Sequence, residues 1–375
     1  MIPKNKTQMA SYLADAMYSS YDRYRKIQEF EHDTGLLKSY FIESHVIPRQ
    51  RDSFHDEIFN FLQKIGQALR IQVFESEDET LFNLMHGKDT YHLDVSDPRF
   101  WIMHTLALST RADKMRRDLI VSSPILDSAW LPTQLLERAA RFGHFRGFGV
   151  VHDETPFITS RSEEVEVETM HLRLWGGSAA AVLDALRQSG IFGHSLALSS
   201  VRLRYWLPGL DDEAIIDNLT FEGKVTALGK SFMSHTNLIS KVHANYSETI
   251  RKIEDKLPIR FVSQDGIAAL EGNPIIINLS REVEDVPDFV SSVFSSALPF
   301  RLWGLSEVYE NNFARVYAVD LHIGHKLTFE ISKDFIRIYL PPNTCGNTVS
   351  RFYTNLQQYY DSMASISGGE FEQIF

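Results

Sequence analysis

The chain has 375 residues, of which 43% are hydrophobic and 23% charged, and its formal net charge is −11. This balance predicts a globular protein of two or three domains and excludes extended disorder over most of the length. The acidic excess disfavours nonspecific binding to nucleic acid or to an anionic membrane, so we do not expect nucleic acid as a partner.

The first residues carry no apolar run typical of a secretory signal, and the sequence has no uninterrupted apolar stretch of about 18 residues. We therefore expect a soluble, cytoplasmic protein without a membrane span. A single cysteine, Cys345, excludes a disulfide within the chain and a cysteine-based zinc site. No set of metal ligands and no phosphate-binding loop has the required spacing, so we expect neither a metal nor a cofactor.

Residues 1–70 predict an N-terminal helical region. Apolar residues recur every three to four positions over 7–32 and again over 52–70, and the second helix has acidic residues in its first turns. Residues 71–144 predict a mixed α/β region that begins with short strands. Its apolar run over 99–108 fits either a buried strand or a short helix.

Two helices are predicted at the end of this mixed region. Thr110 and Asp113 resemble a capping box that opens a helix over 111–121. Pro132 begins the second helix, since proline is favoured in the first turn.

Residues 145–256 and 257–375 predict two modules with the same plan, in which antiparallel strands are followed by a closing amphipathic helix. The closing helices are expected over 231–255 and 346–363, and a loose tail follows the second. We infer a possible internal duplication from this element order. The overall prediction is an α+β fold.

This order of elements is similar in outline to helix-grip folds, the lipid-transfer START-like class, and to the doubled saddle of the TATA-binding-protein-like class. The helix-grip resemblance implies that a helix covers a concave sheet and leaves an apolar cavity for a small ligand or lipid. His235, Tyr246 and Tyr205 would line that cavity. The alternative for His235 is a hydrogen-bonded core histidine, which we favour.

Three residues are weak candidates for catalysis. His152 and Glu154 end a predicted strand, where they could supply a general base, although we favour a solvated turn. Cys345 precedes the last helix, whose N-terminus could depress the pKa of the thiol. Since a catalytic cysteine also needs an oriented histidine, we interpret Cys345 as an incidental thiol.

Basic residues form two clusters on predicted helices. They could bind phosphate or an acidic partner surface, or they could be solvated helix faces with ordinary ion pairs, the interpretation we favour. The patch contains Arg111, Lys114, Arg116, Arg117, Arg138 and Arg141.

The absence of a recognisable catalytic set, together with many aromatic residues, favours a non-enzymatic binding, sensing or scaffold protein in a larger assembly. We expect a protein partner or a homo-oligomer. A microbial stress or phage-defence system is the biological setting that we hypothesise. The alternatives are a helix-grip-type carrier or sensor of an apolar small ligand, and an enzyme of an unrecognised class.

Overall fold

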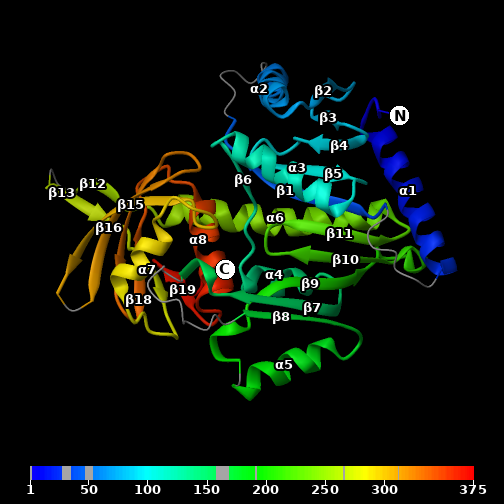
Figure 1. The fold of residues 1–375 in the computed structure, drawn as a ribbon. Coiled ribbons are helices and arrows are strands. Elements are labelled where there is room, and N and C mark those ends of the chain that lie inside the picture. Colours follow the sequence, from blue (N-terminus) through cyan, green and yellow to red (C-terminus); the bar gives the residue numbers. More distant parts are fainter. Residues whose placement is uncertain are drawn as a thin grey trace. The chain divides into compact units, whose positions relative to one another are not determined.

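The computed structural model describes residues 2–27, 35–46, 54–157, 169–190, 192–264, 267–310 and 312–375. Helices and antiparallel strands make up an α+β fold, which confirms the predicted class. The chain divides into two compact units that are each assembled from separate segments (Figure 1). The first contains Met1–Ala129, Arg138–Phe145 and Arg202–Ala244, and the second contains Trp130–Glu137, Arg146–Val201 and Asn245–Phe375.

The first unit is built around an antiparallel sheet whose central strand, β1 (Leu37–Ser44), is buried at every residue. On one side β1 pairs with β5 (Phe100–Thr105), and on the other it pairs with β11 (Lys224–Gly229). In spatial order the strands are β2 (Gln72–Glu75), β3 (Leu81–His86), β4 (Asp89–Asp94), β5, β1, β11 and β10 (Ile215–Thr220), and β6 (Leu126–Ser128) also pairs with β1.

The two faces of this sheet are covered by different helices. Tyr40 and Ile42 of β1 join a hydrophobic cluster with α2 (Phe54–Leu69) and α3 (Ser109–Ser122). Alternate residues of a strand point to opposite faces, so Ser39 and Phe41 lie on the other face. Helix α6 (Phe232–Lys256) covers that face with its first half, and its His243 ring lies 6.1 Å from the ring of Phe41. Helix α1 (Lys6–Ile27) contacts β1 and β11.

The second unit contains a six-stranded antiparallel sheet and several smaller elements. The sheet runs in the order β15 (Leu302–Tyr309), β16 (Phe313–Asp320), β17 (Lys326–Ile331), β18 (Phe335–Tyr339), β14 (Ile275–Asn278) and β19 (Ser365–Gly368). The second unit also contains the β12 (Arg260–Gln264) and β13 (Ile267–Glu271) hairpin and β8 (Thr169–Trp175), which pairs with β7 (His144–Asp153). Strands β7 and β9 (Leu198–Tyr205) each have residues in both units.

One face of the six-stranded sheet is packed and the other is open. Helices α7 (Val286–Val293) and α8 (Gly346–Tyr359) belong to the packed side, where the ring of Phe329 lies 5.2 Å from that of Phe352 in α8. Val316 and Ile338 are also fully buried on this side. The two remaining helices in the described residues are α4 (Thr133–Ala140) and α5 (Ala179–Ser189).

A buried ion pair joins α8 to the sheet. The guanidinium of Arg351 donates to Asp320 and, at 3.0 Å, to the carbonyl of Phe300, while Thr348 also donates to Asp320. Both charged side chains are inaccessible to solvent. Burial tends to raise the pKa of Asp320, but the charge of Arg351 and the donated hydrogen bonds outweigh it and lower that pKa.

Replacing Arg351 should therefore destabilise the second unit strongly. An Arg351→Gln change leaves Asp320 as a buried, unpaired carboxylate, and we expect it to lower the free energy of unfolding by about 3–5 kcal/mol. Urea unfolding measures this loss, with the exposed Lys333→Gln as the control. A loss no larger than that of the control would contradict the structural role of the pair.

The structure settles several local expectations. The 99–108 run forms strand β5, and no helix occurs there. Helix α3 has Leu108 at its N-cap with no side-chain hydrogen bond, so the capping box at Thr110 is wrong. The tail differs too, because residues of β19 pair with β14 and Phe375 is buried. The internal duplication and the helix-grip resemblance stay predictions.

Among the described residues, no helix combines the length and the apolar character that crossing a membrane requires.

Candidate functional site

The open face of the six-stranded sheet carries large hydrophobic side chains. Trp303 and Leu305 of β15 are 45% and 62% exposed, and Tyr317 of β16 is 47% exposed. Leu305 lies directly opposite Tyr317 in the antiparallel register, so the two side chains are neighbours on one face. Tyr309, further along the same face of β15, is also exposed. A sheet face that is open to solvent usually carries polar residues, so the exposed apolar side chains on this face require an explanation.

A hollow of about 580 Å³ lies beside this face in the second unit. Its apolar wall includes Phe261 of β12, which is 84% exposed, and the consecutive Pro341 and Pro342. Tyr317 also lines it and thereby connects the hollow to the open face. The volume is within the usual range of ligand and side-chain pockets.

The carboxylate of Glu330, which accepts several hydrogen bonds, lines the hollow. Glu330 accepts hydrogen bonds of 2.8 Å from both Arg315 and Tyr339, and Arg337 approaches it at 3.5 Å. Burial raises the pKa of Glu330, but the hydrogen bonds from Arg315 and Tyr339 outweigh this effect and lower it. Glu330 therefore engages both arginines and offsets one of their two positive charges.

We call the open surface formed by Trp303, Leu305, Tyr309 and Tyr317 the aromatic face. Its residues were not recognised as functional from the sequence. One signal was available in the sequence. Over 302–309, apolar residues occupy both even and odd positions, whereas a strand with one solvated face should be polar at every second position.

The first unit contains a different kind of cluster, a chain of buried hydrogen bonds around His235. Asp217 of β10 bonds to His235 Nδ1 at 2.7 Å, and His235 Nε2 bonds to the Ser39 hydroxyl at 2.8 Å. The same hydroxyl bonds to His104 Nδ1 at 2.7 Å. All four side chains are at most 4% exposed. This confirms His235 as a hydrogen-bonded core histidine.

The Asp217–His235–Ser39 order is that of a hydrolase triad, but its environment differs. A nucleophilic serine needs a free approach for an electrophile, and Ser39 is 1% exposed with imidazoles bonded on both sides. Burial raises the pKa of Asp217, whose Oδ1 has no partner among the described residues. We therefore interpret this chain of bonds as a polar support for the sheet.

His104 of this network and His92, which lies opposite it on β4, are held neutral. Burial, and to a lesser degree His235, lowers the pKa of His104 to about 3. Burial also lowers the pKa of His92 to about 4, and His92 bonds to Asn83 at 2.7 Å. Such groups weaken the fold in acid, because the unfolded chain binds protons below a pKa of 6.5 and the folded chain does not.

A His104→Gln variant should accordingly lose less stability on acidification than the parent. One such histidine costs the folded state about 1.4 kcal/mol per pH unit below pH 6.5, so the difference between pH 7 and pH 5 should shrink by about 2 kcal/mol. The raised pKa of Asp217 has the opposite effect on stability in acid, but Asp217 is present in both proteins and cancels in the comparison. Urea unfolding at the two pH values measures the difference, with the exposed His86→Gln as the control. Equal acid sensitivity of His104→Gln and the parent would refute this assignment.

The other two expected cavity residues, Tyr205 and Tyr246, make hydrogen bonds to neighbouring side chains. Tyr205 donates to Asn237 and accepts from Lys241 at 3.0 Å in the first unit. Tyr246, in the second unit, donates to Asn347. Their role as ligand-cavity residues stays a prediction.

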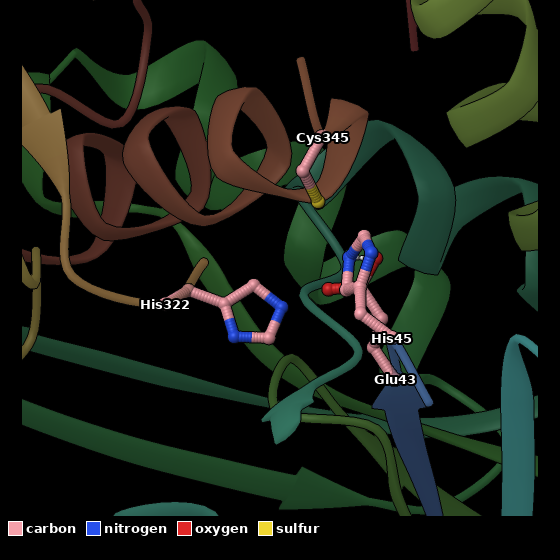
Figure 2. Close-up of side chains that lie close together, drawn as sticks. All are labelled: Glu43, His45, His322 and Cys345. Atoms are coloured by element: carbon pink, nitrogen blue, oxygen red, sulfur yellow. Dashed lines mark ion pairs between the residues drawn. The ribbon is translucent and has the colours of Figure 1, made fainter. Parts of the chain in front are cut away.

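The weak catalytic candidates lie in the second unit. His152 is buried and lies 3.3 Å from Glu154, which also pairs with Arg281. Cys345 caps the start of α8 and is 1% exposed (Figure 2). Its backbone N–H donates to His325 at 3.3 Å, and its Sγ lies within 4.8 Å of a ring nitrogen of His322. The role of His152, Glu154 and Cys345 in catalysis stays a prediction.

Figure 2 also draws a pair from the first unit. Glu43, near the end of β1, lies 3.6 Å from His45 and 2.7 Å from Arg99. Its side chain is fully buried, so the arginine compensates the buried carboxylate.

The predicted anion patch is partly used in ion pairs. Arg111 pairs with Asp89, Lys114 with Asp118, and Arg116 with Glu222 at 2.7 Å. Arg117 lies on α3, Arg138 lies on α4 and Arg141 directly follows α4, and all three residues belong to the first unit. Phosphate binding at this patch stays a prediction.

The sequence matches the MJECL33-like protein family over residues 2–375. The chain belongs to this family. A Methanocaldococcus jannaschii relative named "Uncharacterized protein MJECL33" is 26% identical over 397 aligned residues, which cover 96% of this chain and 92% of the relative. The match to the MJECL33-like family spans both compact units, so the aromatic face and the buried histidine network both lie within the length that the family shares.

Proposed function

We propose that this protein acts by binding a polypeptide partner through the aromatic face of its second unit, as a soluble cytoplasmic component of a larger assembly. The observation that carries this proposal is the exposure of Trp303, Leu305, Tyr309 and Tyr317 side by side on two neighbouring strands. Contiguous exposed apolar residues on a folded protein mark interaction sites, and tryptophan and tyrosine are enriched where partners bind.

The surroundings of the face favour a polypeptide over a phosphate-bearing ligand. Arg315 and Arg337, which lie next to the aromatic residues, both pair with Glu330. The chain as a whole has a net charge of −11, which repels polyanions. The hollow lined by Phe261 and Pro341 has room for a side chain of the partner, which is the arrangement of an interface anchor.

A double Leu305→Glu, Tyr317→Glu variant tests this function. Charges at the centre of an apolar interface cost several kcal/mol, so we expect at least a 100-fold weaker complex. Proteins that co-purify with the full chain from its native cells should be lost with the double variant and kept with Val121→Glu, which changes an equally exposed valine on α3. Recovery of the same proteins with all three chains would refute the proposal.

A further inference from the structure

The edge of the six-stranded sheet next to the aromatic face is open. Among the described strands, β15 has β16 as its only ladder partner, apart from a single bridge between Trp303 and Ser295. The carbonyl of Leu302 accepts from Ser296 and so points away from β16. Because the direction of backbone groups alternates along an antiparallel strand, the N–H and C=O groups of Gly304, Ser306 and Val308 point outward as well. The bridge to Ser295 and the side chain of Phe294 cover Gly304, so Ser306 and Val308 form the open part of the edge.

Of the devices that usually block strand addition, β15 has one charged residue, Glu307. Natural edge strands are protected by proline, lysine or a bulge, whereas the β15 sequence LWGLSEVY contains neither proline nor lysine. The opposite edge of the same sheet, β19, is covered by the chain itself. There Ile374 donates to the carbonyl of Ile366, and Gly368 exchanges backbone hydrogen bonds with Phe371.

The side chains along the open edge define what could pair with it. Trp303, Leu305, Glu307 and Tyr309 share one face, and all four are exposed. Glu307 accepts a hydrogen bond of 2.8 Å from Tyr309 and is the only charged residue of β15. Glu310 follows directly in the turn and is also exposed. An added strand would therefore meet apolar residues interrupted by Glu307, since Arg315, the cross-strand neighbour of Glu307 on β16, is engaged by Glu330.

A second copy of the chain fits this edge poorly. Since β15 contains no basic residue, two β15 strands paired together would bring two copies of Glu307 to the edge without a cation from either strand. Two chains of net charge −11 would also repel each other. Charge complementarity instead favours a segment with a basic residue opposite Glu307 and an apolar residue opposite Leu305.

We propose that an extended segment of another protein, with apolar and basic residues alternating on one face, adds to β15 as a further strand of the sheet. This inference rests on the proposed function and specifies its partner. Main-chain hydrogen bonds to Ser306 and Val308 would hold the segment, while its side chains contact the aromatic face and Glu307.

The experiment uses the full chain and two fluorescein-labelled ten-residue peptides, in which valine alternates with lysine or with glutamate. Ser306→Pro removes an outward N–H without breaking the pairing to β16, and Ser306→Thr keeps that N–H as the matched control. By fluorescence anisotropy, the lysine peptide should bind the parent and Ser306→Thr at least tenfold more tightly than Ser306→Pro. Glu307→Lys should reverse the preference, so that the glutamate peptide binds more tightly.

Equal affinity for Ser306→Pro and Ser306→Thr, or no binding of either peptide, would overturn strand addition. A dimer of the parent chain in sedimentation, abolished by Ser306→Pro, would overturn it as well and assign the edge to a second copy. These failures are separate from that of the proposed function, because co-purification with the Leu305→Glu, Tyr317→Glu variant reports on the face and not on the backbone edge.

Discussion

The period of two along a β-strand is the constraint on which the second unit depends. It sends Val316, Phe329 and Ile338 into the core under α7 and α8, and it necessarily turns Tyr317, Thr328 and Tyr339 the other way. The register of β15 on β16 then brings Leu305 and Tyr317 together. The strand pairing that builds the core therefore also sets the backbone positions that carry the aromatic face, before any partner binds.

The two units handle buried polarity in different ways. In the second unit, the Asp320–Arg351 pair compensates opposite charges inside the protein. In the first unit, Arg99 likewise compensates the buried Glu43, but His104 and His92 are kept neutral, with Nδ1 hydrogen-bonded to Ser39 and Asn83 respectively. Neutral imidazoles avoid the desolvation cost of an ion, but they make the sheet sensitive to acid.

The sequence predicted local structure well because the spacing of apolar residues depends on one helix or strand at a time. The α+β class, most strands and both long closing helices follow from apolar spacing. Even the hydrogen-bonded nature of His235 could be predicted, since the residue lies on the apolar side of its helix. The identity of its partners could not, because Ser39 and Asp217 become neighbours only through the register of distant strands.

The functional surface was harder to predict for a related reason. Apolar residues at 303, 305 and 317 look like core positions, and the sequence does not say which face of a sheet lacks a covering helix. The β19 strand illustrates the same limit, because its polar sequence SISG gave no strand signal and pairing with β14 stabilises it.

The pairing of β1 with β11 has a consequence for how the molecule is made. The central strand of the first sheet is synthesised early, yet its partner runs from Lys224 to Gly229. A ribosome must therefore complete segments of the second unit, including Arg146–Val201, before the first sheet can close. During that interval the edge of β1 that pairs with β11 lacks its partner strand, so translation speed and chaperone binding over this stretch should govern the yield of native protein.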